Sequence, residues 1–382
     1  MKQGWEIKKL GEVCEISTGK SNTEDAVENG QYAFFDRSKV IKKSTKYLFD
    51  CDAIIVAGEG QTFLPKFYSG KFDLHQRAYA IFNFNKNVSV QYVYKYLIHF
   101  HKYFEEVAVG ATAKSLRLRH FQDLPIPIPS LPEQQRIVSI LDDAFSAIAK
   151  AKVNAEQNLR NAKEVFESYL QGVFEGKGEG WEEKRFEELC DLITCGVAAT
   201  PKYVEESEGV PFLSAQNVRD GEVVLDRYRF ISKQFHQELT KKNKPAKGDI
   251  LYSRVGSKFG EAGVVEHDFE FSVYVSLTLI KPKPDKLLNY YLKYYLNSPL
   301  IKDLAKKCIS SSGVPNLNVK EVREFPIKCP PIPIQKKLVD DIEMIASETK
   351  RLEAIYQQKI NDLEEMKKSI LEKAFNGELK TA

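Results

Sequence analysis

The pattern of apolar and polar positions predicts two mixed bodies of strands and helices, each followed by a long polar helix. Apolar and β-branched runs separated by Gly-rich turns have strand composition, and they lie at residues 53–56, 78–82, 249–252 and 273–277. Shorter helices are expected at residues 90–103 and 287–296. Each body therefore reads as a mixed α+β domain of roughly 130 to 155 residues.

A proline-rich segment ends each body. Residues 125–129 and 326–333 cannot be helical in their interiors, because proline lacks the N–H and disfavours helix in the residue before it. Pro132 and Pro333 suit the first turn of a helix, and no proline follows before Gly176 or Gly377. The pattern predicts two helices, at residues 131–176 and 332–377, and about 43 residues at 1.5 Å each make a rod of roughly 65 Å.

Both predicted helices carry apolar or small residues in steps of three and four, which indicates a coiled-coil seam. The first helix begins at body one and ends beside body two, where the second begins, so the seams can bury each other only if the helices run antiparallel, with the bodies at opposite ends. Ordinary bundle packing of each helix is the alternative. The expected interface residues are Ile137, Leu141, Ile148, Leu159 and Phe166 on the first helix and Leu338, Ile342, Ile345, Leu352, Leu363 and Ile370 on the second.

The chain is an internal duplication. Residues 4–14 recur as 180–190, and these segments contain the only two Trp residues. Residues 124–138 match 325–339 at an offset that persists without a gap to the Phe-x-Gly ends at 174–176 and 375–377. Because a repeat determines the architecture, we predict an α+β fold with a pseudo-two-fold repeat, in which bodies at 1–130 and 177–331 alternate with helices at 131–176 and 332–377 before a tail at 378–382.

Composition places the chain among folded proteins. Of its 382 residues, 43% are hydrophobic and 29% charged, and no apolar run approaches the roughly 20 residues that span a bilayer. The first residues lack a signal-peptide core, so a cytoplasmic location is expected. The six cysteines show neither CxxC spacing nor a His at ligand spacing, which indicates reduced, partly buried thiols rather than a zinc site or disulfides.

The sequence contains no complete catalytic motif among those considered below. Residues 14–21 resemble the phosphate-binding GxxxxGKS, but Cys14 replaces the glycine that the tight loop requires, so a strand and turn is the better interpretation. His99 and His101, two residues apart on a predicted helix, face different sides, which disfavours a shared metal. Motifs for amino-methylation and nuclease chemistry are absent, so no catalytic residue and no metal site is predicted.

Basic and amide residues gather in the predicted loops of both bodies. Residues 1–130 contain 18 Lys and Arg against 14 Asp and Glu, a net charge of +4, although the whole chain carries only +3. Lys and Arg neutralise phosphates while Arg, Asn, Gln and Ser pair with base edges, so these loops suit double-stranded DNA; the alternative is a soluble surface. The candidate DNA-binding residues are Arg37, Lys39, Lys42, Lys43, Lys114, Arg117, Arg119, Gln216, Asn217, Arg219, Arg254, Ser257, Lys258, Asn316 and Lys320.

The order of these features resembles the specificity subunit of type I restriction-modification systems, most like the type IC branch. The resemblance rests on a body, an LP-x-P-x-P hinge with Pro132-Glu133-Gln134-Gln135, a long helix ending at Phe-x-Gly, and a Gly-Trp restart, and it covers the whole chain. The second copy departs from the hinge pattern at Ile334 and Lys336.

The resemblance implies a protein without catalysis of its own. Each body would be a target recognition domain that reads one half of a bipartite, asymmetric DNA site, and the helices would set the gap and dock two modification (methyltransferase) subunits. Restriction (endonuclease and translocase) subunits would join this core. No cofactor would bind this chain, while the partners would use S-adenosylmethionine, ATP and Mg. Alternatives are a protein-interaction scaffold without DNA specificity, the subunit of an orphan methyltransferase, or an enzyme that fuses methylation and recognition.

Overall fold

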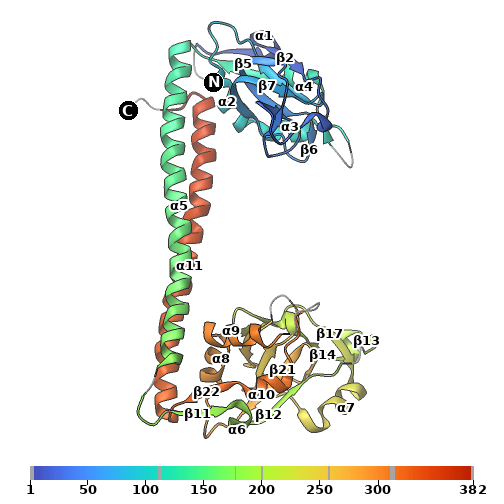
Figure 1. Cartoon of the computed structure of the whole chain (residues 1–382), viewed down its shortest axis with the longest axis vertical. Coiled ribbons are helices and arrows are strands. Elements are labelled where there is room, and N and C mark those ends of the chain that lie inside the picture. Colours follow the sequence, from blue (N-terminus) through green and yellow to red (C-terminus); the bar gives the residue numbers. More distant parts are fainter. Residues whose placement is uncertain are drawn as a thin grey trace. The chain divides into compact units, whose positions relative to one another are not determined.

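The computed structural model describes residues 4–110, 114–176, 178–198, 201–256, 259–309 and 315–379. The chain divides into two compact units (Figure 1): unit 1 comprises residues 1–156 and 357–382, and unit 2 comprises residues 157–356. Each unit therefore holds one body, part of the helix that follows it and part of the helix that follows the other copy.

Unit 1 is built on a twisted six-stranded sheet that is antiparallel except for one parallel pair, β3 with β7. In this sheet the strands follow the order β2 (Glu15–Thr18), β8 (Ala78–Phe82), β5 (Phe49–Ala57), β7 (Lys66–Leu74), β3 (Tyr32–Phe35) and β4 (Lys42–Ser44). A short ribbon pairs β6 (Glu59–Gly60) with β9 (Lys114–Ser115). The strands expected at residues 53–56 and 78–82 are confirmed, because they lie within β5 and β8.

Helices cover one face of this sheet and complete the core of unit 1. Ile54 and Ile81 from the sheet share a core with Tyr92, Leu97 and Phe104. The single helix expected at residues 90–103 is wrong in one respect, because the chain bends at Phe100 and continues as a second helix. The helices are α1 (Leu10–Val13), the 3-10 turn η1 (Thr23–Asp25), α2 (Val90–His99), α3 (His101–Val107) and α4 (Leu118–Gln122).

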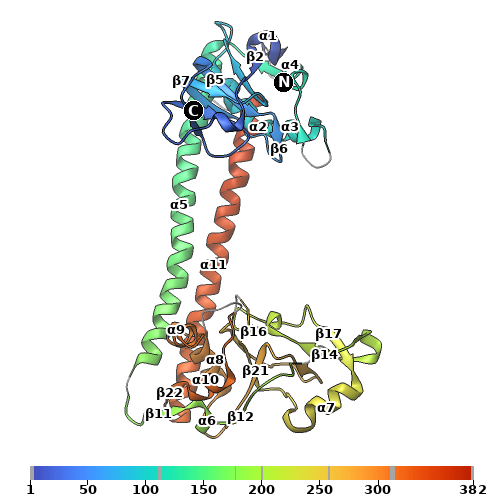
Figure 2. The same ribbon diagram turned by 45° about the vertical axis from the view of Figure 1, so that its right-hand side comes forward.

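Unit 2, whose ribbon is turned forward in Figure 2, divides most of its strands between two four-stranded sheets. One has the order β12 (Cys190–Cys195), β21 (Leu277–Pro282), β18 (Ile250–Ser253) and β19 (Ala262–Val264); the other has the order β13 (Tyr203–Val204), β17 (Arg229–Ser232), β14 (Gly209–Leu213) and β20 (Ser272–Val273). A ribbon pairs β15 (Val218–Arg219) with β16 (Glu222–Val223). The helices are α6 (Phe186–Leu189), η2 (Glu206–Glu208), η3 (Ala215–Asn217), α7 (Lys233–Asn243), α8 (Asn289–Asn297), α9 (Pro299–Lys307) and α10 (Val319–Glu324).

One predicted strand of unit 2 is wrong. The run at residues 273–277 has strand composition, yet β20 ends at Val273 and β21 begins at Leu277. The N–H of Leu277 donates to the carbonyl of Tyr274 at 2.9 Å, which closes a turn over residues 274–276. The equivalent turn in unit 1 is residues 75–77, because the N–H of Ala78 donates to the carbonyl of His75 at 2.9 Å.

The proline-rich hinges form short antiparallel ribbons with the Trp-led openings. In unit 1, β1 (Glu6–Lys9) pairs with β10 (Pro125–Ile128), and in unit 2, β11 (Glu182–Arg185) pairs with β22 (Pro326–Cys329). Prolines are tolerated there because each ribbon has only two strands, so the side without an N–H faces no further strand. The expectation that the hinges are not helical is confirmed.

A buried glutamine joins each hinge to its body. Gln134 is fully buried; its amide nitrogen donates to the carbonyls of Asn87 (2.9 Å) and Pro129 (2.8 Å), and its oxygen accepts from the N–H of Ser89 (2.8 Å). Gln335 repeats the pattern with Lys286, Pro330 and Leu288. The glutamine two residues after Pro132 and after Pro333 is therefore structural: its amide satisfies three backbone groups that are otherwise left without partners.

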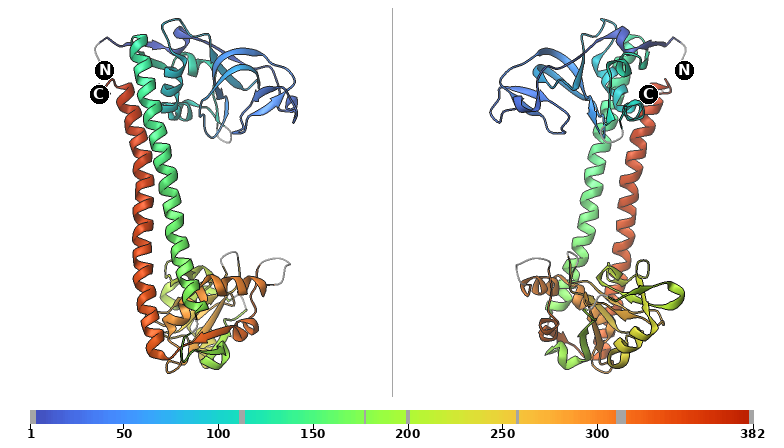
Figure 3. Two further views of the ribbon diagram at one scale, coloured as in Figure 1. Left: turned by 60° about the vertical axis from the view of Figure 1, so that its left-hand side comes forward. Right: turned by 90° about the vertical axis from the view of Figure 1, so that its right-hand side faces the viewer.

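The two long helices pair antiparallel in both units. The start of α5 (Leu131–Glu175) lies beside the end of α11 (Ile332–Phe375) in Figure 3. They share the core of unit 1 through Ile137 and Leu141 beside Leu371 and Phe375. The end of α5 shares the core of unit 2 with the start of α11, through Leu170 and Phe174 beside Val339 and Ile342. Because opposite ends of the helices meet in each unit, the predicted antiparallel coiled coil is confirmed.

Most of the predicted seam is covered. Ile137, Leu141, Ile148, Ile342 and Leu363 are buried, and Leu159, Phe166, Leu338, Ile345 and Ile370 are half-buried. Leu352 is wrong as a buried interface residue, because 42% of it is exposed. The small residues Ala155 and Ala162 and the polar Thr349 are buried instead, so parts of the seam are lined by short side chains.

Each long helix ends in a phenylalanine that packs between two tyrosines of a body, and we call Phe375 and Phe174 the aromatic plugs. Phe375 lies edge-on to Tyr92 and Tyr96, with ring centroids 5.5 and 5.1 Å apart, and Phe174 does the same with Tyr291 and Tyr295 at 5.5 and 4.9 Å. The hydroxyls of these tyrosines donate to hinge carbonyls, as Tyr96 does to Pro125 (2.6 Å) and Tyr295 to Pro326 (2.9 Å). The Phe-x-Gly ends are thus explained by packing against the bodies.

Candidate functional site

Polar loops of unit 1 meet around the turn between β7 and β8, and backbone hydrogen bonds join them. Three of these loops follow β2, β3 and β5. The turn between β7 and β8 and the segment that precedes α4 also take part. We call this set of contacts the loop frame. Its bonds in unit 1 are Gln76 N–H to Ser21 O (2.9 Å), His75 N–H to Phe35 O (2.9 Å), Gly58 N–H to Arg77 O (2.8 Å) and Leu116 N–H to Gly58 O (2.8 Å).

The same loop frame recurs in unit 2, with one bond for each bond of unit 1. The equivalences pair Ser21 with Val197, Gly58 with Arg254, and the turn at 75–77 with the turn at 274–276. The bonds are Val275 N–H to Val197 O (3.0 Å), Tyr274 N–H to Leu213 O (2.8 Å), Arg254 N–H to Ser276 O (3.0 Å) and Leu317 N–H to Arg254 O (2.9 Å). One backbone design thus presents two different sets of side chains.

The glycine of the GxxxxGKS-like segment is explained by a close backbone contact that recurs in both units, and not by phosphate binding. A Cβ built on Gly19 would lie 1.8 Å from the carbonyl oxygen of Leu74, and one built on Gly196 would lie 2.0 Å from the carbonyl oxygen of Val273. Only glycine lets the strand end approach the turn so closely. The interpretation as a strand and turn is confirmed by β2, and a glycine at the same place of each copy is the signal that could have located the loop frame.

The loop frame of unit 1 surrounds an open cavity of about 300 Å³. The residues that line it are all polar or charged: Asn22, Thr23, Glu24, Arg37, Glu59, His75, Gln76 and Arg77. Arg77 donates twice to Glu59, at 2.7 and 2.9 Å, and the Gln76 amide donates to the Asn22 side-chain oxygen at 2.5 Å. These paired donors and acceptors match the kind of groups that base edges offer.

His75 is held in one tautomer at the wall of this cavity. Its Nδ1 accepts from the N–H of Arg77 at 3.0 Å, so the proton of the neutral ring is on Nε2, which lies 3.4 Å from the hydroxyl of Thr23. Burial lowers the pKa of His75, which outweighs the raising effect of Asp36. At neutral pH the ring is therefore an uncharged donor.

The basic residues predicted after β3 lie in different environments. Arg37 lines the cavity and is exposed, as are Lys39 and Lys43. Lys42 instead binds the buried Asp36 at 2.7 Å. Although burial opposes ionisation of Asp36, hydrogen bonds from Lys42 and Ser38 lower its pKa, so Lys42 serves the loop as an ion-pair partner.

The second basic cluster of unit 1 lies around α4. Arg117 is the residue before the helix and Arg119 is within it, and both are exposed. Lys114 is half-buried and donates to the carbonyl of Glu105 at 2.6 Å. Arg117 and Arg119 are therefore available to a ligand, whereas Lys114 joins two segments of the loop.

Two residues predicted to touch DNA in unit 2 are turned inward, which corrects the expectation for them. Asn217 is fully buried; its amide donates to the carbonyls of Val224 and Arg227, both at 3.0 Å, and its oxygen accepts from the N–H of Ser214 at 3.0 Å. Arg254 is 8% exposed. Charge alone could not reveal this, because burial depends on the carbonyls that the fold brings near.

The guanidinium of Arg254 fastens loops to one another. It donates to the carbonyls of Leu317 (2.7 Å) and Val275 (3.0 Å) and to the side-chain oxygen of Asn316 (2.9 Å). Hydrogen bonds from a charged donor are stronger than neutral ones. Arg254 thus reinforces the loop frame at the point where unit 1 has Gly58.

The other candidates of unit 2 are nearer the surface. Gln216 is exposed and donates to the carbonyl of Arg227 at 2.9 Å, and Arg219 binds Asp226 at 2.6 Å. Asn316 and Lys320 are exposed. Ser257 and Lys258 lie outside the described residues.

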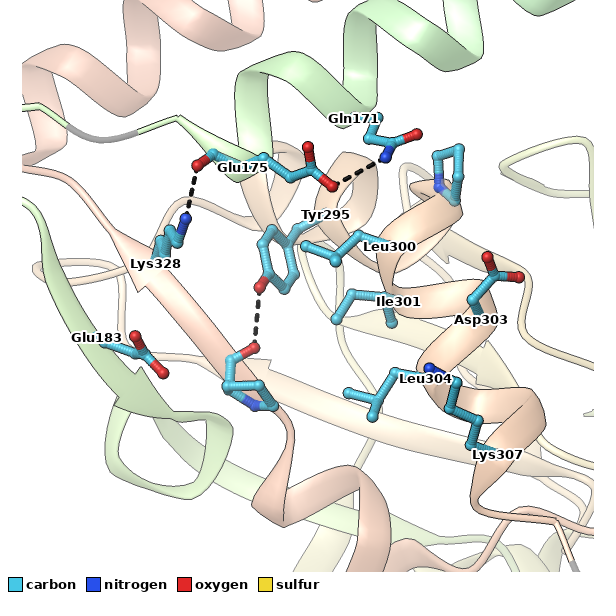
Figure 4. A pocket seen from close by; sticks show the side chains of 12 residues that line it. Gln171, Glu175, Glu183, Tyr295, Leu300, Ile301, Asp303, Leu304, Lys307 and Lys328 are labelled. Carbon is cyan, nitrogen blue, oxygen red and sulfur yellow. Dashed lines mark hydrogen bonds between the residues drawn. The ribbon is translucent and has the colours of Figure 1, made fainter.

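Other parts of unit 2 offer no catalytic arrangement among the described residues. A cavity of about 470 Å³ beside the α5 plug has an apolar wall of Leu300, Ile301 and Leu304 (Figure 4). Its polar groups join the helix end to the hinge: Lys328 donates to the Glu175 carbonyl (2.7 Å), and Gln171 donates to the Glu175 carboxylate (2.8 Å). This cavity is a packing junction.

Thiols, metals and membranes add nothing to this picture. Burial raises the pKa of Cys14 and of Cys190 to about 12, so neither is a thiolate at neutral pH. In the described ranges, no three His, Cys, Asp or Glu side chains gather as metal ligands. None of the described helices combines the length and apolar character needed to cross a bilayer.

The chain has the architecture of a duplicated two-domain binding protein. Its two bodies repeat one loop frame with different side chains, and each body packs on an antiparallel helix pair. Comparison with known proteins identifies the class. The profile of the type I restriction modification DNA specificity domain matches residues 2–157 and 178–365. The chain therefore belongs to this family: it is a DNA-specificity subunit of a type I restriction-modification system.

Individual relatives agree with this membership. The type I restriction enzyme EcoDI specificity subunit of Escherichia coli is 23% identical over 417 residues, which cover 98% of this chain and 88% of that protein. A chain solved for the complex assembly and conformational transition of the type I R-M system has a TM-score of 0.79 at 18% identity, over 99% of both chains. The HsdS subunit from Thermoanaerobacter tengcongensis has a TM-score of 0.62 at 18% identity, over 99% of this chain and 98% of that one. These structures show the same fold.

Proposed function

We propose that this chain is the non-catalytic reader of its complex and that each unit reads one half of a bipartite, asymmetric DNA site. The observation that carries the proposal is the loop frame, which is repeated bond for bond while its side chains differ between units. A repeated frame presents both surfaces in the same way, and different side chains on it give the two half-sites different sequences.

The proposal includes two modification subunits as partners, which dock on the paired helices. Large apolar side chains that are exposed on a helix favour partner contacts when they form patches. In unit 1 these are Val153 on α5 and Met366 on α11; in unit 2 they are Val165 on α5 and Met344 and Ile355 on α11. Restriction subunits join this core in the cytoplasm. S-adenosylmethionine, ATP and Mg are used by the partners and not by this chain.

The experiment for half-site reading is methylation of a randomised DNA library by the assembled complex of this chain and its modification subunits. We expect a motif of two different half-sites separated by unread bases. Binding should weaken steeply with salt, because basic residues release counterions from phosphates. A complex that methylates without a bipartite motif contradicts the proposal and favours the scaffold alternative.

The helix pair is proposed to set the gap between half-sites. Lys152 on α5 binds Glu364 on α11 at 2.5 Å, so residues 150–156 and 360–366 face each other within unit 1. Removing these seven residues from each helix keeps the heptad register and shortens the pair by about 10 Å, which corresponds to about three base pairs. The methylated motif is expected to have a shorter gap, and an unchanged gap contradicts this role. Asn154→Ala, at an exposed polar position of the same segment and with the full-length helices, is the control that keeps the gap.

A further inference from the structure

The turn between β7 and β8, and its equivalent between β20 and β21, lies at the centre of each loop frame. In unit 1 the turn bonds to three other loops, through the backbone of His75, Gln76 and Arg77. In unit 2 the backbone of Tyr274, Val275 and Ser276 makes the same bonds. The position of the turn relative to the neighbouring loops is therefore set by the backbone and not by the side chains that the turn carries.

Buried polar groups hold each turn rigidly. In unit 1 Asp73, directly before the turn, is 2% exposed and accepts from the hydroxyls of Ser21 (2.7 Å) and Ser44 (3.0 Å) and from the N–H of Leu74 (2.9 Å). In unit 2 the hydroxyl of Ser276 accepts from the N–H of Ala215 at 2.9 Å. A side chain mounted on such a support is presented in a defined geometry, as direct readout requires.

The side chains on the two turns differ in chemistry. Gln76 is exposed and its amide is paired with that of Asn22 at the rim of the polar cavity. Glu24 and Glu59 line the same cavity, and their carboxylates disfavour a phosphate there. An amide that offers a donor and an acceptor side by side matches the N6 and N7 edge of adenine.

The equivalent positions of unit 2 are apolar. Val275 replaces Gln76, Val255 replaces Glu59, and Val197 replaces Ser21 in the loop that precedes η1; all three are partly exposed. Such side chains cannot pair with a base edge by hydrogen bonds, but they suit contact with the C5 methyl group of thymine.

We propose that these two turns are specificity-determining segments: Gln76, supported by Asn22, reads an adenine in the half-site of unit 1, and Val275 contacts a thymine methyl in the half-site of unit 2. The inference rests on the proposed function and goes beyond it by assigning individual bases to individual residues. Neither residue is basic, so positive charge in the sequence does not indicate either of them.

The test uses the complete complex with its modification subunits and a randomised DNA library, in which the methylation rate of every sequence is read by sequencing. Gln76→Glu keeps the shape of the side chain but leaves only acceptors, which pair with the N4 amino group of cytosine. We expect one position of one half-site to change from adenine towards cytosine, by roughly 10- to 100-fold in relative rate, while the other half-site stays the same. Val275→Ser removes both methyl groups of valine, and it should relax a thymine in the opposite half-site only.

The controls separate this inference from the proposed function. Gln122→Val, at an exposed position on α4, should leave the motif unchanged. An unaltered motif for both turn variants, an equal loss over all sequences, or no methylation by a variant whose thermal unfolding is unchanged overturns the inference. If the wild-type complex itself gives no bipartite motif, the proposed function fails first.

Discussion

The loop frames of the two units have the same backbone bonds but different means of support. In unit 1 the frame passes through Gly58, which leaves no room for a side chain because a Cβ there would lie 2.5 Å from the carbonyl oxygen of Arg77. In unit 2 the same position is Arg254, whose buried guanidinium fastens three groups from two other loops. At this one position, unit 1 has no side chain, which lets the backbone approach the turn closely, and unit 2 has a large side chain that binds the neighbouring loops.

This difference shows that the polar residues of a duplicated reader divide into two groups. Asn217 and Arg254 look like DNA contacts in the sequence, yet their polar atoms are bound within unit 2. Gln76 and Arg37 lie open at the rim of the cavity in unit 1. The same backbone hydrogen bonds hold the loop frame in both units. Side chains that differ between the units and take no part in these bonds are therefore the ones free to determine which bases are read.

The largest effect is expected from removing Phe375 or Phe174, the aromatic residues that end the two long helices and pack in equivalent positions of the two units. Phe375→Ala should destabilise unit 1 and Phe174→Ala unit 2, each by about 3–5 kcal/mol, because each leaves a cavity between two buried tyrosines. Chemical denaturation measures the loss. Trp5 and Trp181 are the only tryptophans and lie in different units, so single-tryptophan backgrounds made with Trp181→Phe or Trp5→Phe report each unit separately by fluorescence.

The control for the plugs is Val165→Ala, at an exposed position of α5, which should change the free energy of unfolding by less than about 0.5 kcal/mol. If Phe375→Ala destabilises the unit of Trp181 rather than that of Trp5, the assignment of the helix end to unit 1 is incorrect.

A smaller effect is expected at the hinge glutamines. Gln134→Ala and Gln335→Ala each leave buried backbone groups without partners, and each should lower the free energy of unfolding of its own unit by about 2 kcal/mol. Gln135→Ala, whose side chain is exposed, is the matched control. Unequal losses at Gln134 and Gln335 in equilibrium unfolding would break the equivalence of the hinges.

The smallest effect concerns a residue of unit 2 on α7, outside the repeated loop frame. His236 is buried with Nδ1 2.9 Å from the hydroxyl of Ser272, and burial lowers its pKa from 6.5. The folded state therefore disfavours the proton that the unfolded state accepts, so the contribution of His236 to stability is present above pH 6.5 and is lost as the pH falls below that value. Unfolding of unit 2 measured between pH 7 and 5 should depend less on pH in His236→Gln; an equal dependence would contradict this role.

The sequence predicted the repeated parts of the molecule well because their signals are local. Prolines at the hinges, Pro-free helices and apolar steps of three and four follow directly from backbone chemistry, and the paired helices were found from them. Periodicity alone places Leu352 in the seam, but its burial depends on the side chains of the opposite helix, which the pattern of a single helix does not show.

The site was harder to predict because it depends on pairings across long distances in the chain. Val273, Tyr274 and Val275 are β-branched or aromatic, so residues 273–277 read as a strand. The turn at 274–276 instead bonds to Leu213 and Val197 from remote loops. The offset between copies also changes from 201 at the hinges to 199 at the turns, which hid the equivalence of His75 and Tyr274. Gly19 and Gly196 would have revealed it.

The central claim is that one frame holds two different DNA readers, and the most direct measurement is the methylated motif of a chain that carries residues 4–130 in place of residues 180–331 as well as in their own position. Assembled with the modification subunits and sequenced on a randomised library, this complex should methylate two identical half-sites in inverted orientation. A motif that keeps the asymmetry of the wild-type site would contradict the account.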